Sequence, residues 1–230
     1  RGTDIDKANT LRKAGLGLLG NIVGDDKSAP CIEDTAVEYA DLPEYIDEFS
    51  KMMENYGQNP IYYAHAGAGE LHLRPIVNLK KKEGVAQFKS ITADVATLGK
   101  KYQGSMSGEH GDGIVRSSFL PEMIGEKNYA LLKEIKHTFD PKNIFNRGKI
   151  IDPWPIDESL RYEADREEPA VETLMDFSDS LGILRVAEKC NGSGDCRKPV
   201  SGGGTMCPSY RATKDEKDTT RARANMLREI

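Results

Sequence analysis

The chain has 230 residues, of which 38% are hydrophobic and 30% are charged, so it is too apolar for wholesale disorder and long enough to bury a core. Its 37 acidic and 32 basic residues give a formal net charge of −5, which offers no basic surface for nucleic acid. No apolar run reaches about 18 residues, so no transmembrane segment is expected. Because the chain opens with Arg1 inside an amphipathic stretch, we expect it to be part of a larger protein.

The N-terminal part of the chain alternates predicted helices and strands. Apolar side chains recur at helical spacing over residues 4–19, and Gly20 provides a stop. Residues 31–37 are typical of a short strand. Asp41 and Glu44 have the spacing of a capping box, which predicts that a second helix starts there.

A β-hairpin is expected next. Residues 60–65 and 70–76 are rich in β-forming side chains and flank a small, glycine-rich segment. If residues 68–69 form a two-residue turn, His65 and His72 lie directly opposite each other. Their Cβ atoms would then be about 5 Å apart on one face of the sheet.

The middle of the chain adds two helices and a loop. A helix is expected over about residues 80–101, followed by a glycine-rich loop over residues 104–113 and a strand at residues 114–115. Another helix covers about residues 129–139 and ends before Pro141. This order predicts an α+β fold in which helices pack on a mainly antiparallel sheet.

Composition divides the chain into three segments. Residues 1–151 form the first predicted domain. Residues 152–173 contain several prolines and acidic side chains, which predicts a linker or an exposed wrap. Residues 174–230 are too few for a large core, so we expect a small, mostly helical or irregular segment in which the cysteines have a structural role.

Histidine and glutamate suggest a metal site. Two imidazoles on one sheet face suit a single ion, and a catalytic zinc site takes about three protein ligands. We therefore expect His65, His72 and Glu109 to be ligands, the alternative being that both histidines are ordinary sheet residues. His110 projects from a glycine-rich loop and could act as a general base, or could simply hydrogen-bond its own turn.

The C-terminal cysteines suggest a second site. In the ferredoxin pattern C-x2-C-x2-C-x3-C-P, the first three places are taken by Cys190, Ser193 and Cys196. Cys207, followed by proline, takes the last place after an enlarged loop. The pattern predicts a 4Fe-4S site that lacks one ligand, with a structural zinc site or a disulfide as alternatives.

Three segments together carry a family resemblance. Residues 65–72 (His-Ala-Gly-Ala-Gly-Glu-Leu-His), 107–113 (Ser-Gly-Glu-His-Gly-Asp-Gly) and 139–149 resemble the C-terminal domain of FAD-linked oxidases, the family of D-lactate, glycolate and D-2-hydroxyglutarate dehydrogenases. The resemblance covers residues 4–151 and implies a ferredoxin-like substrate domain. Residues 189–211 resemble the iron–sulfur region that follows in large bacterial D-2-hydroxyglutarate dehydrogenase-like proteins.

The resemblance implies a reaction and roles for four residues. The reaction is oxidation of a D-2-hydroxy acid, of the D-2-hydroxyglutarate or D-lactate type, to the 2-oxo acid with hydride transfer to FAD. By similarity, His65, His72 and Glu109 would hold zinc or manganese against the substrate hydroxyl and carboxylate. His110 would remove the hydroxyl proton.

Two further residues are carried over, and some positions depart from the family pattern. Arg12 would pair with the substrate carboxylate, and Asn146 would lie near the flavin ring. Ala68 and Glu70 stand where the family has aspartate and asparagine, and Thr10 where it often has tryptophan. These departures put hydrogen-bond support and substrate choice in question but remove no proposed ligand.

Several partners follow from the resemblance. The chain offers no pyrophosphate-binding loop, so FAD would be held by an upstream domain of the same polypeptide, and electrons would pass through Cys190, Cys196 and Cys207 toward further iron–sulfur sites and an acceptor. We expect a cytoplasmic location, with a peripheral position at the inner membrane through that acceptor as an alternative. Two other functions stay open: a zinc-dependent hydrolase that uses the same ligands, and a non-catalytic electron-transfer module.

Overall fold

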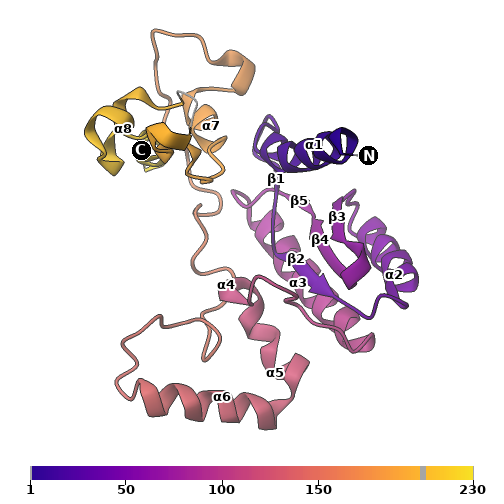
Figure 1. Cartoon of the computed structure of the whole chain (residues 1–230). Coiled ribbons are helices and arrows are strands. Elements are labelled where there is room, and N and C mark those ends of the chain that lie inside the picture. Colours follow the sequence, from indigo (N-terminus) through magenta and orange to yellow (C-terminus); the bar gives the residue numbers. More distant parts are fainter. Residues whose placement is uncertain (1, 203–205, 230) are drawn as a thin grey trace. The chain divides into compact units, whose positions relative to one another are not determined.

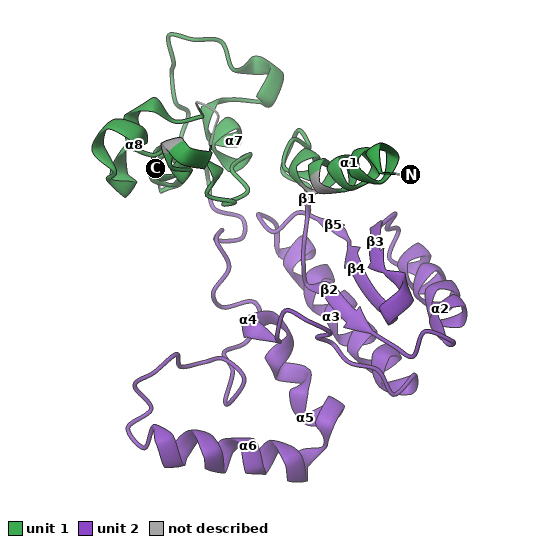
Figure 2. Ribbon diagram, in the orientation of Figure 1, with its two compact units in different colours: residues 1–27, 167–230 green, residues 28–166 purple. Residues whose placement is uncertain are grey.

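The computed structural model describes residues 2–202 and 206–229. Contacts divide the chain into unit 1, residues 1–27 and 167–230, and unit 2, residues 28–166 (Figure 2). The predicted domain boundaries remain a prediction. Within unit 2, Ile156 belongs to the hydrophobic core and Leu160 packs against it, so the first part of the expected linker wraps onto the sheet unit.

Unit 2 is built on a three-stranded antiparallel sheet (Figure 1). Its strands are β2 (Ile32–Ala36), β3 (Ile61–His65) and β4 (Glu70–Arg74), in the spatial order β2-β4-β3. Short strands β1 (Lys27–Ser28) and β5 (Ile76–Val77) lie where the chain enters unit 2 and after β4. The predicted α+β class, with helices on a mainly antiparallel sheet, is confirmed.

One face of the sheet is covered by α2 (Leu42–Asn55) and α3 (Lys82–Lys101). Each helix carries large apolar side chains one turn apart, and burying such a side chain contributes about 1.5–3 kcal/mol. Strands β2 and β4 supply the facing residues, because alternate strand positions point to the same face. The most deeply buried members of this core are Tyr45, Phe49, Met53, Ile91, Val95, Ile32 and Leu73.

The predicted capping box at the start of α2 is wrong. Asp41 is the N-cap residue, but its side chain makes no capping hydrogen bond. Its backbone already has helical angles (φ −87°, ψ −9°), whereas a capping side chain reaches the first-turn N–H groups from an extended backbone. Pro43 in the first turn, which has no N–H to satisfy, favours the helix start instead.

The predicted two-residue hairpin turn is also wrong. Residues Ala66–Ala68 form a 3-10 turn, and Gly69 follows with φ 70°. A Cβ at Gly69 would lie 1.9 Å from the carbonyl oxygen of Val37, so the position requires glycine for space as well as for conformation. The turn is therefore longer than expected, and the strand register shifts accordingly.

Residues 114–115 are helical, which corrects the strand predicted there. They lie in α4 (Gly113–Arg116), where the Arg116 N–H donates to the Asp112 carbonyl at 3.1 Å. Val115 packs against the core from this helical turn, so its burial needs no partner strand. Beyond it lie η2 (Ser117–Phe119), α5 (Leu120–Ile124) and α6 (Glu126–Phe139). As predicted, α6 ends just before Pro141.

Unit 1 is helical with irregular connections. The helix α1 (Thr3–Leu19) ends at Gly20 as predicted. Thr219 caps α9 (Thr220–Arg228) by accepting a 2.9 Å hydrogen bond from the Ala222 N–H, and α9 packs against α7 (Ile183–Glu188). In the ranges that the structure describes, no helix is long and apolar enough to cross a membrane. The remaining elements of unit 1 are η3 (Ser178–Ser180), α7 (Ile183–Glu188), η4 (Asp195–Arg197), η5 (Val200–Gly202), α8 (Pro208–Thr213), η6 (Glu216–Asp218) and α9 (Thr220–Arg228).

Candidate functional site

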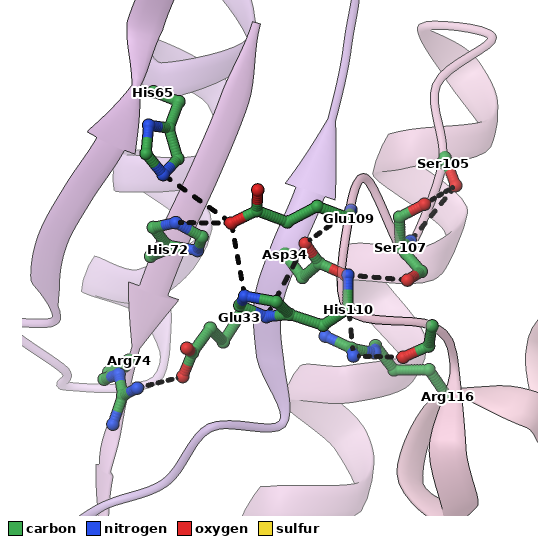
Figure 3. Close-up of polar contacts among 11 residues, drawn as sticks. Glu33, Asp34, His65, His72, Arg74, Ser105, Ser107, Glu109, His110 and Arg116 are labelled. Atoms are coloured by element: carbon green, nitrogen blue, oxygen red, sulfur yellow. Dashed lines mark hydrogen bonds and ion pairs between the residues drawn. The ribbon is translucent and has the colours of Figure 1, made fainter. Parts of the chain in front are cut away.

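Polar side chains gather on the sheet face that the helices leave uncovered. Glu70, His72 and Arg74 alternate along β4, so all three point to this face. Glu33 of β2 lies opposite His72 and forms an ion pair with Arg74 (Figure 3). His72 is only 9% exposed, so its imidazole is buried among these charged side chains.

The two sheet histidines share this face, although not in the predicted register. Tyr63 is opposite His72, and His65 is opposite Glu70. The register is thus shifted by two residues from the one that the short turn implied. A shift of two keeps every side chain on its face, and the histidines meet as diagonal neighbours with ring centroids 5.1 Å apart.

Glu109 brings the histidines together with the glycine-rich loop. Its Oε1 atom lies 3.6 Å from Nε2 of His65, 3.8 Å from Nε2 of His72 and 3.2 Å from Nε2 of His110 (Figure 3). The His110 ring stacks on the His72 ring, with ring centroids 5.4 Å apart and an angle of 9° between the ring planes. The structure therefore places the three predicted metal ligands and the predicted base in one cluster.

The donor set of this cluster suits a divalent ion. Ligand atoms of His65, His72 and Glu109 all lie within 4.8 Å of one another. In a tetrahedral zinc site, ligand atoms are about 3.4 Å apart, which follows from metal–ligand distances near 2.1 Å. The distances of 3.6 and 3.8 Å from the Glu109 oxygen are close to that value, so small side-chain movements would complete the geometry.

Asp34 holds the loop that carries Glu109 and His110 by hydrogen bonds. The sequence analysis did not identify it. It occupies an irregularity in β2 between Glu33 and Thr35, with φ 95°, and it is fully buried. Its carboxylate accepts hydrogen bonds from the Ser107 hydroxyl at 2.7 Å and from two backbone N–H groups of the loop at 2.9 Å each. The available signal was two adjacent acidic residues inside a short strand that is otherwise uncharged.

The loop that carries Glu109 is tied to the sheet at further points. The Gly108 N–H donates to the Asp34 carbonyl at 2.7 Å, and Ser105 forms an isolated bridge with Ala36. The buried Arg116 guanidinium donates to the Gly111 carbonyl at 2.6 Å and lies 3.7 Å from the Asp34 carboxylate. Both sides of the loop are thus anchored to one strand.

Burial and hydrogen bonding set the charges in the cluster. Burial alone would raise the pKa of Asp34, but hydrogen bonds from Ser107 and from the loop backbone lower it to about 2. Burial, with Asp34 and Glu109 nearby, raises the pKa of Glu70 to about 7. Burial also lowers the pKa of His72. The neutral imidazole that results is the form that binds a metal.

Two other predicted residues are not members of this cluster as the structure describes it. Arg12 is an exposed residue of α1 in unit 1. Asn146 follows α6 with φ 46°, and its Oδ1 atom accepts a 2.7 Å hydrogen bond from Lys149. Their roles toward substrate and flavin remain predictions.

The C-terminal cysteines are free thiols and so form no disulfide. Cys207 precedes α8, where the Tyr210 N–H and then Thr220 lower its pKa to about 7 despite burial. A hydrogen bond to Glu216 raises the pKa of Arg221, and the nearby Cys196 and Cys190 add to this effect. Within residues 2–202 and 206–229, none of these cysteines joins a close group of three ligand atoms. Their iron–sulfur role remains a prediction.

Comparison with known proteins identifies a family and several relatives of this chain. Residues 2–150 match the family model of FAD linked oxidases, C-terminal domain. The chain is 36% identical to a D-2-hydroxyglutarate dehydrogenase of Pseudomonas putida and 33% identical to one of Escherichia coli, with 98% of this chain and 22% of each relative aligned. A D-lactate dehydrogenase of Archaeoglobus fulgidus is 39% identical over 51% of this chain and 26% of that relative.

The extent of these matches decides what they establish. The chain spans about a fifth of the length of the two D-2-hydroxyglutarate dehydrogenases, 22% in each case. The family match covers 149 consecutive residues, counted from 2 to 150, and includes every member of the histidine–glutamate cluster. The chain therefore belongs to the FAD linked oxidases, as a member of their C-terminal domain family.

Proposed function

We propose that unit 2 is the substrate-binding and proton-accepting part of an FAD-dependent dehydrogenase that oxidises a D-2-hydroxy acid to the 2-oxo acid. The observation that carries this proposal is the convergence of three imidazole nitrogens on one oxygen of Glu109. The names of the relatives, D-2-hydroxyglutarate and D-lactate dehydrogenases, support the substrate class.

Three residues would hold a divalent metal, zinc or manganese. They are His65, His72 and Glu109, and the ion would act as a Lewis acid that lowers the pKa of a substrate hydroxyl. Burial lowers the pKa of His72, which favours the neutral imidazole that a metal ion binds. Zinc accepts imidazole and carboxylate ligands alike, and manganese prefers oxygen, so Glu109 suits both.

His110 would accept the hydroxyl proton of the substrate at its Nε2 atom. Its side chain is 47% exposed, so a substrate can reach it, and stacking on His72 fixes the plane of its ring. The Nε2 atom faces the cluster and is 3.2 Å from Glu109, so the base and the ligands address the same small volume. Geometry and access are the two requirements for a general base.

The cofactors and the other predicted residues complete the proposal. A flavin would supply the hydride acceptor. The described residues contain no succession of strand, glycine-rich loop and long helix that could hold its pyrophosphate, so FAD would be bound by other residues. Arg12 would pair with the substrate carboxylate, and Asn146 would lie near the flavin. Cys190, Cys196 and Cys207 would bind iron and pass electrons onward.

The activity test uses the full-length protein that contains these residues. We expect His110→Ala to slow oxidation of D-2-hydroxyglutarate or D-lactate by roughly 10²–10⁴-fold, which is the usual contribution of a general base. His137→Ala is the matched control, because His137 lies on exposed α6 and belongs to none of the close ligand groups. Unchanged turnover in His110→Ala would contradict the assignment and favour a non-catalytic electron-transfer module.

The metal test uses the 230-residue chain itself. We expect Glu109→Ala to lower the affinity for Zn²⁺ or Mn²⁺ by more than roughly 10-fold, since even residues that only orient ligands commonly contribute that much. Glu134→Ala on exposed α6 is the control. Isothermal titration calorimetry measures both. Flavin-independent hydrolysis of esters or amides by the zinc-loaded chain would instead support a zinc hydrolase and overturn the dehydrogenase proposal.

A further inference from the structure

We propose that Asp34 is a positioning residue that holds the backbone of Glu109 and His110 in the arrangement that the site uses. This role is not contained in the ligand and base assignments, because Asp34 reaches both residues through their N–H groups and not through their side chains. Its consequence for metal and substrate rests on the proposed function. Its structural part can be tested without either.

The contacts of the carboxylate show why it positions the loop. Oδ1 accepts the Glu109 N–H at 2.9 Å, and Oδ2 accepts both the His110 N–H at 2.9 Å and the Ser107 hydroxyl at 2.7 Å. A carboxylate has about four lone-pair directions, so three donors occupy most of them. Asp34 is therefore directed at the loop that carries Glu109 and His110.

The backbone of Asp34 is shaped for this task. The position is an irregularity in the β2–β4 ladder, and it is held at φ 95°, where residues other than glycine are uncommon. An extra residue in a strand turns its side chain out of the normal alternation. Such a strained conformation persists where the surroundings impose it, and here the Gly108 N–H on the Asp34 carbonyl and the three donors on its carboxylate do so.

The arrangement also sets which nitrogen of His110 faces the cluster. Nδ1 of His110 lies 3.7 Å from the Asp34 carboxylate, whereas Nε2 lies 3.2 Å from Glu109. Because Asp34 also holds the His110 N–H, it fixes the place from which the ring reaches the cluster. Asp34 thus places the loop so that Nε2 of His110 faces the cluster.

Amide hydrogen exchange, followed by NMR on the 230-residue chain without metal, tests the positioning. Glu109 and His110 are exposed residues, yet we expect their N–H groups to exchange at least roughly 10-fold more slowly than that of Gly111, because hydrogen bonds to charged groups are among the strongest. For the Gly111 N–H, no acceptor is found in the described part of the chain. Equal rates at the three positions would overturn the proposal.

Asp34→Asn gives the second measurement. Asparagine tolerates the positive φ and keeps the size of the side chain, but its NH2 group cannot accept, so one of the two loop amides loses its partner. We expect exchange at Glu109 or His110 to accelerate by roughly 10- to 100-fold. The matched control is Asp140→Asn, a buried carboxylate in the same unit that accepts two backbone N–H groups of its own, both at 2.9 Å.

The outcomes separate this inference from the proposed function. In the control, the Glu109 and His110 amides should keep their wild-type exchange, and a folded Asp34→Asn with unchanged exchange at both would refute the positioning role. Cobalt(II) absorption then reads out the cluster, and we expect Asp34→Asn to bind Co²⁺ roughly 10- to 100-fold more weakly than wild type. If the wild-type chain binds no Co²⁺, the metal proposal fails, and the exchange rates still decide the role of Asp34.

Discussion

Substitution of Gly69 tests how the hairpin turn presents the histidines. At φ 70°, an alanine costs about 1–2 kcal/mol of backbone strain. Its Cβ would also lie 1.9 Å from the Val37 carbonyl oxygen, so one backbone must move away. That movement strains the 3.0 Å hydrogen bond from the Val37 N–H to the Gly69 carbonyl, which contributes about 0.5–1.5 kcal/mol. We therefore expect Gly69→Ala to lower the free energy of unfolding by about 2–3 kcal/mol.

Gly67→Ala in the same turn is the matched control. No atom lies within 4 Å of a Cβ added there, and Gly67 does not have a positive φ, so the expected change is within about 0.5 kcal/mol. Urea unfolding followed by the fluorescence of Trp154, the single tryptophan of the chain and a residue of unit 2, measures both variants. If Gly69→Ala unfolds within about 0.5 kcal/mol of Gly67→Ala, the close approach to Val37 is not a constraint and the reasoning is wrong.

Three further outcomes are expected. Phe49→Ala, which empties a fully buried core position, should cost about 3–5 kcal/mol in the same urea assay, and a loss below about 1 kcal/mol would contradict the packing described here. Cys31 is 1% exposed, and burial raises its pKa to about 11. A thiol reagent at neutral pH should therefore modify it only after unfolding. Modification of the native protein at the rate of a free thiol would contradict this burial. Lys136 and two backbone N–H groups lower the pKa of Asp140 from 3.8 to about 2, so its stabilising effect is complete above pH 3.8 and is lost as the pH falls through about 2. Circular dichroism between those pH values should therefore show a weaker pH dependence of stability in Asp140→Asn than in wild type, and identical curves would refute the role of this carboxylate.

The positions of the two sheet histidines show how far sequence periodicity reaches. Side chains alternate along a strand with a period of two, so His65 and His72 face the same side in the predicted register and in the observed one. The prediction that the two histidines lie directly opposite each other was wrong, because the turn contains a 3-10 segment and continues to Gly69, which lies close to the Val37 carbonyl. The face was therefore predictable from local pattern, whereas the register depended on a contact between distant residues.

The strand predicted at residues 114–115 was wrong for a related reason. Two β-branched residues favour a strand only if a partner strand can supply hydrogen bonds, and none of the described strands pairs with them. The Arg116 N–H instead closes a helical turn on Asp112, while the Arg116 side chain reaches the Gly111 carbonyl. The contacts that anchor the glycine-rich loop therefore outweigh the preference of residues 114–115 for a strand.

The sequence by itself determined the family, the apolar faces of the helices and the residue types of the site. Three motifs in the order and spacing of the FAD-linked oxidases identify the family, because such a combination is seldom met by chance. Only the tertiary structure decided that Glu109 and His110 lie against His72, which precedes them by more than 30 positions in the numbering. The physical reason is Asp34, whose irregular strand position turns a buried carboxylate toward the loop, and such a contact between distant segments leaves no periodic trace in the sequence.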